Sequence, residues 1–592
     1  MIEAVYGRLA HIKQIIINAI SVFIPDLAGE SVRQPPVSFA AKYSNLIMAS
    51  LVINVLSLAL PIMTLQVYDR ILVSENIGTV NVLATGVFVI VILEAIIRLT
   101  RSYVIGWSGA AHEHSIACNA MRHMLASELS SLEKLGSGEQ LQRMAGISKM
   151  REFLSGQALI TLIDLPFVII FMSLIGYLAG ALVLVPIILI SIFAFIAFRL
   201  GNSLKEKLHK RDKTDEKKVG FIIETLNGIH TIKSLGLEAI FQRKYEQIQA
   251  ESSLANYYVA KESNSASNYG SIFTQAMIIG MVGFGAPMAV NGELTLGTLI
   301  ACILLSGRIM SPIQKSLGIW ARYQDFQLAK ESVSKTFELP TLKRVDEKKL
   351  GEKEGKIELK GISFSYDDDG PLLFDNLNIS LKRGESISIS GDHSSGKTTL
   401  LKLMSGLYKP TKGNVLINGV EATKYPAREL VKHIGYMSME GTIFRGTIRE
   451  NLNAFGEIPE SQVEEIIKLL KLKKEISKLP AGFETKLEGG TADPIPPGLK
   501  QKIAIARVLA PKPRIILFDN ADRALDRDGY NQIYKLLGRL KDKVSMVIVT
   551  DDHNILHLAQ HEYVISDGKL VERSFLDDSK IHDVLPYQEL RI

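Results

Sequence analysis

The residues of this chain best suited to chemistry form one short loop, residues 391–398, whose sequence is GDHSSGKT. It fits the pattern G-x-x-x-x-G-K-[ST], in which backbone N–H groups surround nucleotide phosphates and the lysine adds a positive charge. An apolar run before the loop predicts a strand and the run after it predicts a helix, which is the context that the motif requires. We therefore expect Lys397 to contact the β- and γ-phosphates of ATP and Thr398 to bind Mg²⁺. The expected nucleotide-binding residues of this loop and its helix are Gly391, Ser394, Ser395, Gly396, Lys397, Thr398 and Thr399.

A second apolar run, residues 515–518, ends at the carboxylate of Asp519. A buried strand that ends in an acid near such a loop typically holds Mg²⁺ through a water molecule, so Asp519 joins Thr398 as an expected metal-binding residue. The next residue is Asn520, whose amide has no proton affinity to offer as a general base near neutral pH, although it could position a water molecule. The nucleotide half therefore combines intact binding residues with a weak hydrolytic position.

The elements that position this loop occupy only the second half of the chain. The 592 residues are 47% hydrophobic and 22% charged, and the two kinds are unevenly spread. Residues 44–313 contain long apolar runs, whereas the residues from 356 onward have the composition of a soluble α/β protein. A membrane-spanning helix needs about 20 mostly apolar residues. Six segments meet that requirement: 44–66, 79–99, 157–178, 180–198, 269–290 and 295–313.

Two long polar segments, residues 100–156 and 199–268, separate the apolar ones, and the second is rich in lysine. Because Lys and Arg favour the cytoplasmic side of a membrane, we expect both segments and both termini in the cytoplasm. Asp164 and Arg308 fall inside expected spans, where an ionisable group is a functional candidate because its burial in lipid is costly. The alternatives are a helix–helix contact or a side chain that reaches the interface.

Other features narrow the class of protein. The two cysteines, Cys118 and Cys302, lack metal-ligand spacing, which argues against zinc and a disulfide framework. The net charge of +6 is modest and fits loop charge beside a membrane, so no nucleic-acid partner is expected. The apolar spacing in residues 1–40 suits an amphipathic helix at a membrane surface better than a signal peptide. Pro61 and Pro166 should kink or locally open their helices.

Six spans with two long cytoplasmic loops, followed by a P-loop domain, resemble an ABC exporter half-transporter. Residues 60–72, LPIMTLQVYDRIL, are similar to the first extracytoplasmic turn of type I secretion exporters, which move proteases, RTX toxins and adhesins. Residues 164–167, 224–233 and 305–308 also match that family. The resemblance implies a membrane α-helical domain with six transmembrane helices, followed by an α/β P-loop ATP-binding cassette.

The expected domains follow from these segments. An interfacial segment takes residues 1–40, the six-helix domain with its two cytoplasmic loops takes 41–335, a linker takes 336–355, and the cassette takes 356–592. The resemblance places the protein in the bacterial inner membrane, with the cassette in the cytoplasm.

Several cassette positions depart from the family pattern. The resemblance assigns Tyr366 to stack on adenine, although an ordinary strand-end tyrosine is the alternative. The family has Glu where this chain has Asn520, Gln where it has Met439, and His where it has Asp551. A thioether is only a weak acceptor, and a carboxylate repels the γ-phosphate, to which histidine can donate. His553 could replace Asp551 only if the loop slips by two residues.

The L-S-G-G-Q signature is also altered. Residues 495–501, IPPGLKQ, occupy its place. In the family, the serine hydroxyl and the glycine N–H groups hold the γ-phosphate that is bound on the opposite cassette. Pro496 has neither hydroxyl nor N–H and Pro497 removes a second N–H, so only Gly498 remains. A signature of this kind is not expected to close on ATP in the usual way.

These departures, beside intact Lys397, Thr398 and Asp519, suggest ATP binding without useful hydrolysis. The first hypothesis is a degenerate subunit of a type I secretion-like exporter for a polypeptide cargo, working with an active second half-transporter. The alternatives are a weakly hydrolysing homodimeric exporter and a non-transporting regulatory membrane protein that ATP gates. The resemblance further implies a periplasmic adaptor and an outer-membrane channel as partners.

Overall fold

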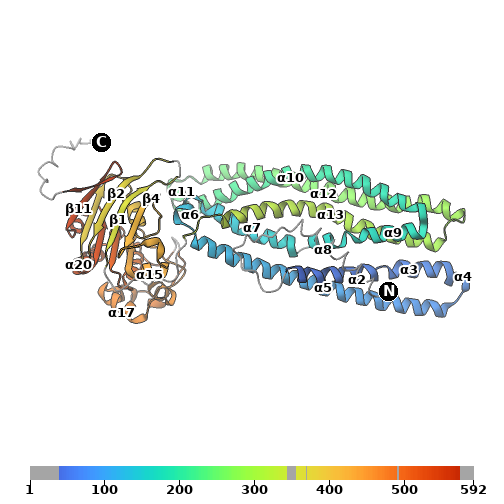
Figure 1. Cartoon of the computed structure of the whole chain (residues 1–592), viewed down its shortest axis with the longest axis horizontal. Coiled ribbons are helices and arrows are strands. Elements are labelled where there is room, and N and C mark those ends of the chain that lie inside the picture. Colours follow the sequence, from blue (N-terminus) through green and yellow to red (C-terminus); the bar gives the residue numbers. More distant parts are fainter. Residues whose placement is uncertain (1–38, 156, 343–354, 368–369, 490–492, 574–592) are drawn as a thin grey trace. The chain divides into compact units, whose positions relative to one another are not determined.

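A computed structural model of the chain describes residues 39–155, 157–342, 355–367, 370–489 and 493–573. They form two compact units (Figure 1). The helical unit takes the chain up to Leu125 together with Leu135–Leu339, and the cassette unit takes Ala126–Lys134 together with the chain from Pro340 onward. The expected interfacial segment, except for its last two residues, and most of the expected linker lie outside the described residues.

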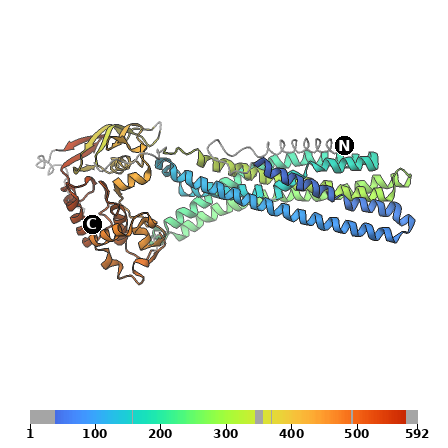
Figure 2. The ribbon, with the colours of Figure 1, turned by 60° about the horizontal axis from the view of Figure 1, so that its bottom comes forward.

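The helical unit consists of long helices joined by short turns. Its apolar segments form helices because their backbone groups find all their partners within one segment. In this unit α10, α12 and α13 pack along one another, as Figures 1 and 2 show from two directions. The helices are α2 (Phe39–Leu56), α3 (Ala59–Gln66), a π-helical turn (Val67–Ile71), α4 (Leu72–Ser74), α5 (Ile77–Ala126), α7 (Ser137–Ser155), α8 (Gln157–Asp164), α9 (Phe167–Ala179), a 3₁₀ turn (Gly180–Val183), α10 (Leu184–Asn227), α11 (Ile229–Leu235), α12 (Glu238–Val290) and α13 (Leu296–Phe337).

Each of the six predicted apolar segments is helical over most of its length. By length and composition, five helical stretches among the described residues are able to cross a membrane. One of the five, Gly138–Asn227, contains two of the predicted segments, and the chain turns between them at Gly180 (φ 53°, ψ −116°). The number of six spans therefore stays a prediction. Pro166 opens its helix as expected, because α8 ends at Asp164 and Pro166 is the N-cap of α9.

The turn with the sequence of residues 60–72 is fixed by a carboxylate. Asp69 lies in the π-helical turn, where its Oδ1 accepts the N–H of Gly297 at 2.9 Å and its Oδ2 accepts the hydroxyl of Thr295 at 2.6 Å. Those two residues begin α13, so the carboxylate satisfies an otherwise unpaired N–H at a positive helix end. A Cβ on Gly297 would lie 2.5 Å from Asp69 Oδ1, which explains why glycine occupies this position.

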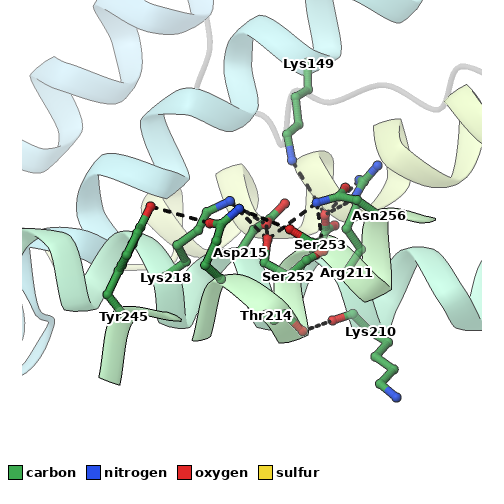
Figure 3. Close-up of polar contacts among 12 residues, drawn as sticks. Lys149, Lys210, Arg211, Thr214, Asp215, Lys218, Tyr245, Ser252, Ser253 and Asn256 are labelled. Carbon is green, nitrogen blue, oxygen red and sulfur yellow. Dashed lines mark hydrogen bonds and ion pairs between the residues drawn. The ribbon is translucent and has the colours of Figure 1, made fainter. Parts of the chain in front are cut away.

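Farther along the long helices, a polar cluster joins α7, α10, α12 and α13 (Figure 3). Asp215 of α10 accepts the hydroxyl of Ser252 of α12 at 2.7 Å. Arg211 of α10 pairs with Asp325 of α13 at 2.7 Å. Burial raises the pKa of Asp325, although Arg211 acts in the opposite direction. Paired polar side chains thus join these helices, because partly buried polar groups need hydrogen-bond partners.

The cassette unit contains two main sheets and one short pair, β7 (Gly446–Thr447) with β8 (Lys486–Leu487). The first sheet is antiparallel in the order β2-β1-β4-β5, with β1 (Ile357–Phe364), β2 (Phe374–Leu381), β4 (Lys412–Ile417) and β5 (Val420–Glu421). The second has the order β12-β11-β3-β10-β9-β6, and all of its pairs are parallel except β11 with β12. Its strands are β3 (Ser386–Gly391), β6 (Ile434–Met437), β9 (Ile515–Asp519), β10 (Ser545–Val549), β11 (His561–Ser566) and β12 (Lys569–Arg573).

Helices cover this second sheet and complete two apolar cores. The strands β9 and β10 are buried along their whole length, as expected for parallel strands that are covered on both faces. The helices are α14 (Lys397–Met404), α15 (Ala427–His433), α16 (Ile448–Leu452), α17 (Glu460–Leu469), α18 (Leu472–Ile476), α19 (Pro497–Leu509), α20 (Arg527–Leu540) and α21 (His553–Leu556). One short helix from far upstream, α6 (Leu129–Lys134), also belongs to this unit.

Candidate functional site

Four loops of the cassette meet because they follow neighbouring parallel strands. The order β3-β10-β9-β6 brings the carboxyl ends of these strands to one edge of the sheet. The P-loop follows β3, Asp551 follows β10, Asn520 follows Asp519 at the end of β9, and Met439 follows β6. Ligands of open α/β sheets bind at this edge. The structure therefore gathers the P-loop and three of the altered positions, which lie far apart in the sequence.

The P-loop has the conformation that its glycines permit. Gly391 (φ 147°) and Gly396 (φ 95°) both have positive φ, and a Cβ on Gly396 would lie 2.7 Å from Phe374 Cζ. Ser394 also adopts a positive φ of 70°, which costs a residue with a side chain about 1 kcal/mol. The ammonium of Lys397 donates to the carbonyls of Gly391 and Asp392 in its own loop, the second at 2.9 Å. The lysine charge is thus held over the loop whose N–H groups would hold phosphates.

An oxygen-rich position lies between the P-loop helix and β9. Thr398 donates its hydroxyl to Asp519 Oδ1 at 3.1 Å, and Tyr436 of β6 donates to Asp519 Oδ2 at 2.8 Å. Asp519 is only 3% exposed. Hydroxyl and carboxylate oxygens are the ligands that Mg²⁺ prefers, so Thr398 and Asp519 fit this ion. Bound there, it would neutralise charge on the β- and γ-phosphate oxygens.

Tyr436 is a site residue that the sequence did not reveal. It sits in an apolar strand pattern, and its hydroxyl became visible as a partner of Asp519 only in the fold. Burial, together with the nearby Asp519 carboxylate, raises the pKa of Tyr436 far above its ordinary value. The phenol therefore stays protonated and serves as a donor to Asp519.

Two of the altered positions share one arginine. Arg523, in the loop after β9, forms an ion pair with the Asp551 carboxylate, and its Nη1 lies 3.9 Å from Met439 Sδ. Asn520 has a left-handed backbone (φ 49°), and its side-chain Oδ1 is buried with no partner among the described residues. The sequence indicated the negative charge of Asp551 but not its pairing with Arg523, whose charge offsets it.

The loops after β9 and β10 are further tied to each other. Thr550 donates to Asp522 at 2.9 Å, and Tyr530 of α20 donates to Asp552 at 2.7 Å. Asp552 also caps α21 by accepting the N–H of Ile555 at 3.0 Å. His553 is the first residue of that helix. A two-residue slip that would bring His553 to the place of Asp551 would break these contacts.

The altered signature begins a helix. Pro496 is the N-cap of α19 and Pro497 is its first residue. A helix N-terminus binds anions through its free N–H groups, and both prolines lack one. The N–H of Leu499 is already bonded to the Pro496 carbonyl at 3.0 Å, so Gly498, which is not altered, has the one backbone N–H among residues 496–498.

Tyr366 lies beside the P-loop helix, as its expected role requires. Its ring is 47% exposed and packs edge-on against Phe364, at a centroid distance of 5.2 Å. Its hydroxyl is 2.5 Å from the Thr399 hydroxyl in the first turn of α14. An exposed aromatic face next to the phosphate loop can stack on a base.

The comparisons with known proteins agree with this architecture. Residues 44–313 match the family model of the ABC transporter transmembrane region, and residues 374–523 match the family model described as ABC transporter. The two matches together cover more than half of the chain, which belongs to the ABC transporters and is a multi-pass membrane protein. A bacterial Atm1-family ABC exporter with ATP bound has the same fold, with a TM-score of 0.77 at 18% identity over 91% of this chain and 95% of that one.

The similar curated proteins narrow the class to exporters related to toxin secretion. The chain is 28% identical to the alpha-hemolysin translocation ATP-binding protein HlyB of Escherichia coli over 90% of its length and 76% of that protein. It is also 28% identical to the exotoxin translocation ATP-binding protein PaxB of Pasteurella aerogenes, over 90% of this chain and 75% of that protein. The chain is 26% identical to the leukotoxin export ATP-binding protein LtxB of Aggregatibacter actinomycetemcomitans, over 90% of this chain and 76% of that protein.

Proposed function

We propose that this chain is the ATP-binding subunit of an exporter for a polypeptide cargo, and that it hydrolyses ATP poorly at its own P-loop. Its place is the bacterial inner membrane, with the cassette in the cytoplasm. The similarity to the toxin translocation proteins supports the polypeptide cargo, together with a periplasmic adaptor and an outer-membrane channel as partners.

The observation that carries the proposal is the contrast between two sets of residues at one sheet edge. Lys397 donates to carbonyls of the P-loop, and Thr398 donates to Asp519, which supports the binding of ATP and Mg²⁺ there. By contrast, Asn520 cannot take a proton from water, and Met439 offers only a thioether. Losing one such group typically lowers a rate by about 10²–10³, and the losses need not add.

Dimerisation determines how much activity remains. In the exporter family the two cassettes close on ATP together, so each site combines one chain's P-loop with the other chain's signature. A heterodimer would pair a partner's intact hydrolytic groups with the Pro496–Pro497 signature of this chain. A homodimer would combine both defects in each site. We therefore propose an active second half-transporter as the partner.

One observation favours the second candidate, a weakly hydrolysing homodimer. Arg523 pairs with Asp551 and adjoins Met439, so a cation stands among the altered positions. A guanidinium there could hold phosphate charge in place of the family histidine. The third hypothesis, an ATP-gated regulatory protein, has no observation in its favour.

The test is ATP binding and hydrolysis by the purified full chain in lipid, with Lys397→Ala as the control. We expect binding that depends on Lys397 with no measurable turnover. Lys397-dependent turnover by the chain alone would establish the homodimer instead. Absence of ATP binding would overturn both.

A further inference from the structure

The helical unit contains a cavity of about 380 Å³ with an unusually basic wall. It lies among α5, α8, α9 and α13 and the end of α2. Both ionisable residues that the sequence analysis placed inside expected spans, Asp164 and Arg308, line it. Four cationic side chains and one carboxylate belong to this wall: Arg98, Arg101, Arg308, Lys315 and Asp164.

The single carboxylate is already engaged. Arg101 is 5% exposed and donates through Nη1 to Asp164 Oδ1 at 2.9 Å and to the Ser50 hydroxyl at 2.6 Å. Its Nη2 lies 3.4 Å from Asp164 Oδ2. The Nε of Arg101 is buried and has no hydrogen-bond partner among the described residues. Arg101 therefore neutralises Asp164, so this carboxylate does not offset the charge of the other cations in the wall.

The other cations differ in their partners. Arg98 pairs with Glu94, one turn earlier on α5 and outside the cavity wall. Arg308 and Lys315, both on α13, form no ion pair with any residue that the structure describes. A cation without a partner among apolar helices costs several kcal/mol unless an anion or water compensates it. Arg308 is half-buried and lies inside the apolar stretch Leu296–Ser316, where this cost applies most.

The rest of the wall suits a peptide better than a lipid tail. Around the cations, the wall has several side chains with hydrogen-bonding groups and few large apolar side chains. The polar ones include Asn54, Ser102 and Ser311. Such groups can pair with the N–H and C=O groups of an extended backbone, whereas an acyl chain would leave them unpaired. The volume lies within the range of about 300–1,000 Å³ that small-ligand pockets have.

We propose that this cavity binds an acidic segment of the exported polypeptide, with a carboxylate of the segment held by Arg308 and Lys315. The proposal rests on the proposed export of a polypeptide and adds a specificity for acidic side chains or a C-terminal carboxylate. Guanidinium groups bind carboxylates with two parallel hydrogen bonds, and Arg101 already does so with Asp164.

The test uses the full chain in nanodiscs of phosphatidylcholine, with fluorescent hexaglutamate and hexaglutamine peptides of equal length. We expect hexaglutamate to bind, hexaglutamine not to bind, and the affinity to fall as salt rises. Arg308→Gln should weaken hexaglutamate binding about tenfold, because it removes a charge-assisted pair. Arg308→Lys should retain most of the binding. Lys330→Gln, on the same helix but away from the cavity wall, is the matched control and should bind like the unaltered chain.

Three results would overturn the proposal. The first is equal binding of the two peptides, and the second is unchanged hexaglutamate binding by Arg308→Gln. The third is full displacement of the peptide by added phosphatidylglycerol, which would identify a lipid headgroup site instead. Lys397-dependent ATP binding is measured in the same nanodiscs: if it persists while the peptides show no preference, only the cavity proposal fails. If it is absent from the unaltered chain, the proposed function itself fails.

Discussion

Arg523 and Asp551 form an ion pair between the loop after β9 and the loop after β10, beside the P-loop. Both side chains are about half exposed, so the pair contributes little to folding stability. Its consequence is local: a carboxylate that would repel the γ-phosphate is accompanied by a cation that would attract it.

The first prediction follows from that pair. Arg523→Ala leaves Asp551 uncompensated, so ATP affinity should fall about fivefold to tenfold, which corresponds to one partly screened unit charge of about 1 kcal/mol. Asp551→Ala added to Arg523→Ala should recover most of the loss, because the repelling charge is then gone. Fluorescent ATP-analogue titration of the single and double variants measures this coupling.

The control for this cycle is Arg527→Ala, at the exposed start of α20. It removes the same charge from the same region without touching Asp551, so ATP affinity should stay unchanged. Equal losses from Arg523→Ala and Arg527→Ala would show a general charge effect and no specific compensation.

Restoring the hydrolytic groups should restore hydrolysis only in combination. Asn520→Glu alone should raise turnover by no more than about tenfold, because the positions of Met439 and Asp551 stay altered and such groups act as a unit. Asn520→Glu with Met439→Gln and Asp551→His should raise it by about 10²–10³. Steady-state phosphate release measures the rates, and Lys397→Ala in the triple variant should return them to the baseline.

The backbone limits this gain. Asn520 has φ 49°, and glutamate adopts such a left-handed conformation less readily than asparagine. We therefore expect Asn520→Glu to lower the thermal unfolding midpoint slightly while it raises turnover. A triple variant that folds, binds ATP and still shows baseline turnover would locate the defect in the signature instead.

The signature prolines provide a separate test. Pro496→Ser with Pro497→Gly returns a hydroxyl and two N–H groups to the N-terminus of α19, where anions bind. Energy transfer between labels on the two chains measures ATP-driven closure of the two cassettes. The apparent ATP affinity for this closure should then rise at least tenfold. The substitution Pro459→Ser is the control, because Pro459 is the N-cap of α17, a helix outside the four loops. If the unaltered chain closes at the same ATP concentration as the variant with Pro496→Ser and Pro497→Gly, these prolines do not limit closure.

The parts of the site that were predictable from the sequence depend on local spacing. The P-loop glycines, Lys397 and Asp519 occupy fixed positions relative to their own strands, so a motif locates them without the fold. Arg523 was not predictable, because its partner Asp551 is 28 residues away and meets it only through the parallel pairing of β9 and β10. Tyr436 was hidden for a similar reason, within a strand whose neighbours are apolar.

In the helical unit, too, local features were predictable from the sequence and distant partners were not. The prolines and apolar runs predicted where helices lie, and Asp164 was recognised as costly to bury. Its partner Arg101 lies just beyond the predicted span 79–99, so the sequence offered no reason to pair the two. The roles of the altered cassette positions, and the number of six spans, stay predictions.

The last prediction concerns Asp69, whose carboxylate holds the start of α13. Asp69→Ala removes both hydrogen bonds to this helix end and should lower the stability of the helical unit by about 1–2 kcal/mol, the usual cost of losing a charged cap. Gly297→Ala should lower it further, because the new Cβ would lie 2.5 Å from Asp69 Oδ1 and 2.8 Å from the Leu65 carbonyl. Thermal unfolding in detergent measures both, with Glu75→Gln in the neighbouring exposed turn as the control. The contradicting result is that Asp69→Ala lowers the thermal stability and Gly297→Ala does not. The carboxylate would then cap α13 from a distance that leaves room for a side chain, and the close approach of Gly297 to Asp69 would not fix this turn.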